Sequence, residues 1–262
     1  MNTLTSALWT ETLKMRRSKI PLFTALGFSV VPFIGGLFMI ILKDPEAAKS
    51  MGLISAKAQL LAGVADWPTY FGILAQATAV GGAILFSIVT IWVFGREFSD
   101  HTAKELLALP TARETIVSAK FLVIVVWVLL LTLVMFAIGL LVGKLVVIPG
   151  WSIILVRSAF GDVVGSAILT MALLPFVAFF ASTGRGYMPP FGWTILTVVL
   201  AQIAAITGWG DWFPWSVPAL FSGVAGPRAN LLGIHSYIIV VVTCISGFLA
   251  TLYWWRDADH TK

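Results

Sequence analysis

The sequence predicts an all-α, polytopic membrane protein with six transmembrane helices. Of the 262 residues, 59% are hydrophobic and only 11% are charged, whereas about 25% of the residues of a soluble domain are charged. Apolar runs recur along the chain, and each is long enough to cross a hydrocarbon core of about 30 Å. No alternating β pattern interrupts them. We therefore expect one transmembrane domain over residues 1–262.

The six spans are predicted at residues 20–42, 71–95, 121–142, 163–181, 191–207 and 234–255. Residues 1–19 are polar and basic, and we expect a helix at the membrane interface. Its basic side chains are expected to face anionic head groups; they are Lys14, Arg16, Arg17 and Lys19. A simple basic flank that sets orientation is the alternative. Trp151–Asp162 is expected to form a separate interfacial or partly inserted helix before the fourth span.

An even number of spans puts both ends of the chain on the same side. Most of the basic residues fall on that side in this topology, namely Lys14, Arg16, Arg17, Lys19, Arg96, Lys104, Arg113, Lys120, Arg185, Arg256 and Lys262. Basic residues concentrate in cytoplasmic loops of membrane proteins. The sequence therefore predicts a multi-pass protein of the cytoplasmic membrane with both termini in the cytoplasm. The formal net charge of +5 reflects this orientation and gives no indication of nucleic-acid binding.

A long polar interruption between two strongly apolar spans runs from Arg96 to Lys120. Thr102 with Glu105, and Thr111 with Glu114, each match the capping box of a helix start. Pro110 biases the residue before it away from helical geometry. We therefore expect a short helix over Ala103–Ala108 and, after a break, a second helix that continues into the third span. A solvated loop is the alternative. A helix this short is unstable alone, but held between two spans it could transmit force.

The chain lacks the motifs of an enzyme. No G-x-x-x-x-G-K-[ST] phosphate loop is present, so the chain is not expected to bind and hydrolyse ATP in the P-loop manner. The histidines His101, His235 and His260 are scattered and have no metal-ligand spacing. Neither H-E-x-x-H nor G-x-S-x-G occurs. We therefore predict no catalytic residue and no metal site in this chain.

Polar residues near the spans are candidates for a translocation path. Asp162 follows Arg157 by five residues, which separates the two by about 140° on a helix, so they are not expected to pair. An interfacial position for both is favoured over a substrate or proton site, although a carboxylate in the bilayer is costly enough to suggest function. Gln76 lies in the second span.

The segment from Gly208 to Asn230 is rich in Trp, Pro and Gly, and includes Trp209, Trp212 and Trp215. It predicts either an aromatic belt at the outer interface or a re-entrant pair of short helices that forms an outer gate. The pairs Gly139 with Gly143 and Gly161 with Gly165 match the spacing of close helix crossings or of a subunit interface.

The central segment also carries a resemblance. In order along the chain it contains Glu97, Thr102, Leu106-Leu107, Pro110, Arg113 and Lys120. This pattern, the six spans and the Trp- and Pro-rich stretch before the last span resemble the ABC-2 type permeases, the membrane subunits of ABC exporters. The size and compact loops are most similar to the permeases of bacitracin or lantibiotic resistance and immunity. Family members with large external domains differ, because the loop over residues 43–68 is small.

The resemblance implies a separate cytoplasmic ATPase subunit, in two copies, that holds ATP and Mg. Its groove would receive the short helix. Polar contacts would come from Glu97, Asp100, Lys104, Glu105 and Arg113, and apolar packing from Leu106, Leu107 and Leu109. The path would form between two permease copies, or one copy and a paralogue. The expected cargo is amphipathic or hydrophobic, such as a peptide antibiotic or a lipid-like molecule. The alternative is a stand-alone ion-coupled secondary transporter or channel that uses Asp162 and Gln76.

Overall fold

The computed structural model describes residues 3–44, 64–102, 105–106, 111–224 and 232–257. Six helical segments in this part of the chain are long and apolar enough to cross a membrane, as the sequence predicts. They are α2 (Ile20–Lys43), α5 (Trp67–Ser99), α7 (Arg113–Leu145), α8 (Ile153–Met171) with α9 (Leu174–Thr183), α10 (Met188–Thr207) and α12 (Ile234–Asp257). The shorter helices are α1 (Thr3–Arg17), the 3₁₀ helix η1 (Pro214–Ser216) and α11 (Val217–Phe221). The described residues contain no strand.

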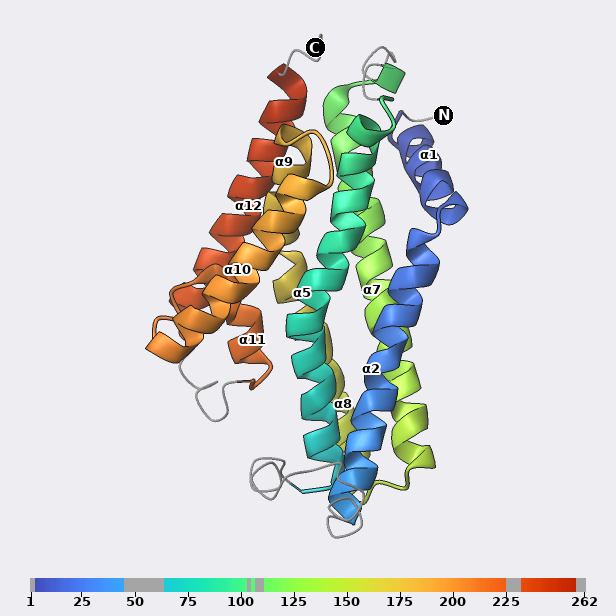
Figure 1. Cartoon of the computed structure of the whole chain (residues 1–262), viewed down its shortest axis with the longest axis vertical. Coiled ribbons are helices and arrows are strands. Elements are labelled where there is room, and N and C mark those ends of the chain that lie inside the picture. Colours follow the sequence, from blue (N-terminus) through green and yellow to red (C-terminus); the bar gives the residue numbers. More distant parts are fainter. Residues whose placement is uncertain (1–2, 45–63, 103–104, 107–110, 225–231, 258–262) are drawn as a thin grey trace.

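The helices form two groups, which Figure 1 shows side by side. The first group contains α2, α5, α7 and α8, and the second contains α9, α10 and α12. α5 joins the groups because it packs against α2, α7 and α8 as well as α9 and α10. α1, the end of α5, the start of α7 and the last turn of α12 lie at one end of the bundle, at the top of Figure 1. We call this end the terminal side.

The second span begins earlier than apolarity alone predicts. α5 starts at Trp67, and the carboxylate of Asp66 caps it by accepting a hydrogen bond from the Thr69 backbone N–H at 2.9 Å. A side-chain acceptor at this position satisfies one of the free N–H groups of the first turn. Pro68 fits there because the first turn requires no N–H bond from it.

The capping boxes predicted in the central segment are wrong in detail. α7 begins after Ala112, which occupies the cap position and has no side-chain acceptor. Glu114 therefore lies inside the first turn, where its charge complements the helix N-terminus. In the first predicted capping box, Thr102 with Glu105, the hydroxyl of Thr102 instead donates to a carboxylate oxygen of Glu97 at 2.7 Å. Of the short helix predicted for Ala103–Ala108, only residues 105 and 106 are among the described residues, and both are helical.

The fourth span corrects the prediction of a separate helix over Trp151–Asp162. α8 begins after Ser152, whose hydroxyl accepts from the Ile154 N–H at 3.3 Å, and it continues without interruption past Asp162. The helix breaks later, at Ala172 and Leu173, and resumes as α9 with Pro175 in its first turn. Proline lacks an N–H and its ring clashes with the carbonyl four residues earlier. Pro175 therefore decides where the span is divided.

A close crossing joins α5 to α7. A Cβ at Gly143 would lie 2.3 Å from the ring of Trp67, and one at Gly139 would lie 2.6 Å from Leu74. Trp67 and Leu74 are both fully buried. Gly139 and Gly143 therefore form a close helix crossing, which is one of the two roles predicted for their spacing. The helices can approach this closely only because the two glycines lack side chains. At the second pair, Gly161 has nothing within 4 Å of its Cβ position.

Two parts of the predicted architecture remain predictions. α1 is helical and packs mainly against α7, but its place relative to a bilayer is not tested. The segment between α10 and α12 does contain two short helices, η1 and α11, which pack against α10 and α8 respectively. Whether they re-enter a membrane is likewise untested.

Candidate functional site

Four charged side chains from three helices meet on the terminal side. We call Glu11, Lys14, Glu97 and Lys120 the charge cluster. The Lys120 Nζ donates to Glu97 Oε1 at 2.8 Å and to Glu11 Oε2 at 3.0 Å, and the Lys14 Nζ donates to Glu97 Oε1 at 2.7 Å and to Glu11 Oε1 at 2.9 Å. The side chains of Lys120, Glu97 and Glu11 are 0%, 3% and 6% exposed. The cluster contains two positive and two negative groups, so it is formally neutral.

The positions of these residues follow from helix geometry. Glu11 and Lys14 are three residues apart on α1 and therefore lie on one face of that helix. Glu97 is in the last turn of α5, and Lys120 is two turns into α7. The third donor of Lys120 reaches the Val93 carbonyl at 3.0 Å, so its ammonium group uses all three of its donors. The cluster therefore fixes α1 against both α5 and α7.

Burial would by itself lower the pKa of Lys14, because it disfavours the charged form. The carboxylates of Glu11 and Glu97 more than offset this effect and raise the pKa above its ordinary value of 10.5. Lys14 thus remains a cation under physiological conditions. This result corrects the prediction that Lys14 faces anionic head groups, because its ammonium group is bound to the carboxylates of Glu11 and Glu97 and only 25% of its side chain is exposed.

The charge cluster is connected directly to the start of the central segment. The Thr102 backbone N–H donates to the Glu97 carbonyl at 3.0 Å, and its hydroxyl donates to Glu97 Oε2 at 2.7 Å. His101 adopts a left-handed backbone with φ of 57°, which turns the chain back toward α5. The Leu106 N–H donates to the Thr102 carbonyl at 3.0 Å. A displacement of the segment at Thr102 therefore acts on Glu97 first.

The far end of the same segment is bound to α12. The guanidinium of Arg113 donates from one nitrogen to the carbonyls of Trp255 and Arg256, at 3.2 and 2.9 Å. A cation at the C-terminus of a helix is favoured because the last carbonyls are unsatisfied and carry partial negative charge. The segment from Thr102 to Arg113 is thus connected at one end to α1, α5 and α7 and at the other end to α12.

The other residues predicted to contact the ATPase differ in how exposed they are. Asp100 is exposed and pairs with Arg96 at 2.9 Å. Glu105 is exposed, whereas Leu106 is half-buried and packs against the hydrophobic core. Glu97 is occupied by partners within its own chain. The remaining predicted residues, Lys104, Leu107, Leu109 and Pro110, lie outside the described residues.

The residues predicted for a translocation path do not converge on one site. Asp162 lines a cleft of about 330 Å³ between α5, α8 and α11, with Phe71 and Phe221 among its walls. Arg157 is exposed on α8 and forms no ion pair with Asp162, as their spacing predicts. Gln76 is half-buried on α5 and lines none of the pockets described here.

The three tryptophans predicted for an outer gate do not lie together either. Trp209 and Trp212 are 69% and 58% exposed, and Trp212 stacks on His235 with ring centres 4.5 Å apart. Trp215 instead packs against Trp193, with ring centres 5.5 Å apart.

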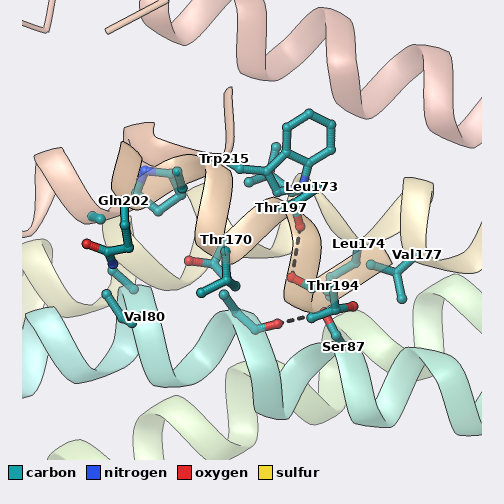
Figure 2. A pocket seen from close by; sticks show the side chains of 16 residues that line it. Val80, Ser87, Thr170, Leu173, Leu174, Val177, Thr194, Thr197, Gln202 and Trp215 are labelled. Carbon is teal, nitrogen blue, oxygen red and sulfur yellow. Dashed lines mark hydrogen bonds between the residues drawn. The ribbon is translucent and has the colours of Figure 1, made fainter. Parts of the chain in front are cut away.

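Trp215 also lines a narrow pocket between α5, α9 and α10, which Figure 2 shows from close by. Its volume is about 40 Å³, which is room for only a few water molecules. Four hydroxyl groups face it, from Ser87, Thr170, Thr194 and Thr197. Each donates to a carbonyl one turn earlier on its own helix, at 2.6 to 3.0 Å. Their hydrogens are therefore already engaged.

Sequence reasoning missed two members of the charge cluster. Glu11 is absent from the predicted site, and Lys120 appears among the predictions only as a basic residue of the motif and the flank. One sequence feature could have indicated Glu11, because it precedes Lys14 by three residues on a predicted helix. No local feature indicates that these groups meet Lys120, which is 109 residues away from Glu11 in sequence.

Comparison with known proteins identifies the family of the chain. The sequence model of the ABC-2 family transporter proteins matches residues 7–201, which include the whole charge cluster and the central segment. The chain is also 27% identical over 180 residues, or 68% of its length, to the bacitracin transport permease protein BCRB of Bacillus licheniformis, of which the match covers 85%. The six helical segments that are long and apolar enough to cross a membrane agree with a membrane transport protein. The chain therefore belongs to the ABC-2 family of transporter proteins and is a multi-pass membrane permease subunit of an ABC transporter.

Proposed function

We propose that this permease is the membrane subunit of an exporter and that a separate cytoplasmic ATPase subunit drives it through the segment between α5 and α7. The observation that supports this most strongly is the bonding of that segment at both of its ends. Thr102 contacts the charge cluster, and Arg113 contacts the end of α12. Both chain ends would then face the cytoplasm, on the terminal side.

The bonding pattern suggests how ATP-driven movement would enter the membrane. Glu97 accepts from Thr102 and also from Lys14 and Lys120. A push on the segment would therefore move α5, α7 and α1 together, while Arg113 would carry the same displacement to α12. ATP can shift the permease between two states only if the ATPase contacts these states differently. The bonds of Thr102 and Arg113 at the two ends of the segment support it as the part that makes that difference.

The docking contacts are proposed from exposure and chemistry. Glu105 and Asp100 are exposed and would make polar contacts, together with Lys104. Leu107 and Leu109 would pack in the groove of the ATPase, while Leu106 already packs on the permease core. Thr102, Glu97 and Arg113 would transmit the movement from within the permease. Pro110 would separate the docking helix from α7.

The cargo path is proposed to form between two permease copies, or between this chain and a paralogue, with two ATPase copies below. The pocket within the chain in Figure 2 is far too narrow for a peptide or lipid. α10 offers an apolar face instead, with Leu196, Val199 and Ile203 at 50 to 52% exposure. An amphipathic or hydrophobic cargo, such as a peptide antibiotic, fits this surface and agrees with the similarity to a bacitracin transport permease.

The test is a pull-down of the tagged full-length chain from its native membrane, with measurement of the ATPase activity recovered. The wild type is expected to recover a P-loop ATPase, and Glu105→Arg is expected to lose most of it. Asp257→Arg is the matched control, because Asp257 is also exposed on the terminal side but belongs to α12. Thr102→Val is expected to keep the ATPase bound while reducing cargo-stimulated hydrolysis several-fold.

Two outcomes would contradict the proposal. Equal recovery with Glu105→Arg and Asp257→Arg would exclude the segment as the docking site. Absence of any ATPase, together with transport that an ion gradient drives and that Asp162→Asn abolishes, would establish the secondary transporter instead.

A further inference from the structure

A large groove on the terminal half of the molecule has no role in the function proposed above. It has a volume of about 610 Å³ and lies between α1, the start of α2 and α7. Its wall on α7 contains Leu122, Val126 and Leu130, which follow at intervals of four residues and so share one helix face. These positions span about 12 Å along the helix axis. The groove thus offers an extended apolar wall next to α1.

The α1 side of the groove is chemically different. Thr12 and Arg16 line it, and both are exposed. Within the described part of the chain, neither side chain has a hydrogen-bond or ion-pair partner, and the one carboxylate on α1, Glu11, is already bound in the charge cluster. A guanidinium and a hydroxyl without partners therefore lie beside an apolar channel.

We propose that this groove binds one anionic phospholipid from the leaflet on the terminal side, with an acyl chain along α7 and the phosphate on Arg16. The apolar wall favours a hydrocarbon chain because burial removes its surface from water. The guanidinium favours phosphate because it forms paired, charge-assisted hydrogen bonds. A zwitterionic head group fits less well, since its own cation competes with Arg16. The combination selects an amphiphile with one anionic end.

A bound lipid would act on the same helix as the charge cluster. Met15, which is 4% exposed, lines the groove and lies one residue from Lys14. A ligand that binds only the docked position of α1 stabilises that position by mass action. The lipid would therefore support the contact of α1 with α7 from outside the protein, while the charge cluster supports it from inside.

The experiment uses the purified full-length chain in detergent, without any ATPase, so that it is independent of the proposed transport function. Dioleoyl phosphatidylglycerol and dioleoyl phosphatidylcholine are titrated separately, and bound lipids are counted by native mass spectrometry. We expect one phosphatidylglycerol per chain, bound about tenfold more tightly than phosphatidylcholine, the difference that charge-assisted hydrogen bonds supply.

Arg16→Gln is expected to abolish this preference. Arg17→Gln is the matched control, since it removes the same charge from the next residue, and Arg17 lines a different hollow with Trp92 and Arg96. Val126→Phe should fill the groove and weaken phosphatidylglycerol binding several-fold, whereas Val241→Phe should not, because Val241 lies on α12 and is similarly exposed, at 53% against 56% for Val126.

Three results would overturn the proposal. Equal binding of the two lipids, or equal effects of Arg16→Gln and Arg17→Gln, would mean that only unspecific boundary lipid is present. Unchanged binding in Val126→Phe would place the lipid elsewhere. A chain that binds neither lipid and self-associates through this face would assign the groove to a second copy.

Discussion

The titratable side chains that contact each other are buried at one end of the bundle and partly exposed at the other. On the terminal side, the charge cluster joins three helices, and the side chains of Lys120, Glu97 and Glu11 are at most 6% exposed. At the opposite end, Asp211 and His235 approach at 3.2 Å with 21% and 34% of their side chains exposed. Exposed pairs contribute little to stability, whereas breaking a buried pair is costly. We infer that buried charges hold the terminal side rigidly, whereas the contact between Asp211 and His235 can rearrange at low cost.

The strongest test of this contrast is Lys120→Met. The change leaves Glu11 and Glu97 with only Lys14 as a cationic partner in a buried site. We expect the free energy of unfolding to fall by about 3–5 kcal/mol, the usual cost of removing one partner of a buried pair. The measurement is the unfolding midpoint of the purified chain in detergent. Lys144→Met is the control, because Lys144 is exposed on the same helix. Equal unfolding midpoints for the two variants would show that the charge cluster stabilises the protein no more than an exposed lysine does.

The second test asks whether the rigidity extends along the crossing of α5 and α7. Gly143→Ala would place a methyl group 2.3 Å from the ring of Trp67, and overpacking of this kind costs about 1–3 kcal/mol. The unfolding midpoint should fall accordingly. Gly161→Ala has open space at its Cβ position and should be neutral or slightly stabilising, since alanine is favoured over glycine in helices. A loss as large in Gly161→Ala would show that the effect is not due to packing.

The smallest effect is expected at the opposite end. Asp211→Asn removes the carboxylate that approaches His235 but leaves His235 stacked on Trp212. The free energy of unfolding should change by less than about 1 kcal/mol, as for other partly exposed pairs. The same unfolding assay in detergent measures it. If Asp211→Asn destabilised the protein as much as Lys120→Met, the opposite end would be as firmly held as the terminal side.

Hydropathy was sufficient to predict the number of spans, because each apolar run must satisfy its backbone hydrogen bonds as a helix. The exact ends depend on local chemistry and not on hydropathy. Asp66 and Thr69 show where α5 begins, and Pro175 shows where the fourth span breaks. Both features are visible in the sequence.

The charge cluster could not be predicted in the same way. Glu97 belongs to the predicted central segment, but its partners Lys14 and Lys120 come from helices that only the folded bundle brings together. Lys14 was assigned to the membrane surface because a lysine on an interfacial helix ordinarily faces lipid head groups. Only the position of α1 against α7, with Glu11 and Met15 buried, reverses that assignment. Tertiary contact therefore decided the role of the residues that matter most for the proposed mechanism.

The interruption at Ala172 and Leu173 has a consequence for how the fourth span can move. α8 packs mainly against α5, and α9 mainly against α12, where Gly247 lets the chain approach Pro175 and Phe176 directly. Because Pro175 offers no N–H, the backbone ladder between the two halves is incomplete. We therefore expect α8 and α9 to move as two helices connected by a hinge at Ala172 and Leu173. A tilt of α12 on the terminal side can carry α9 with it while α8, and with it Asp162, keeps its direction.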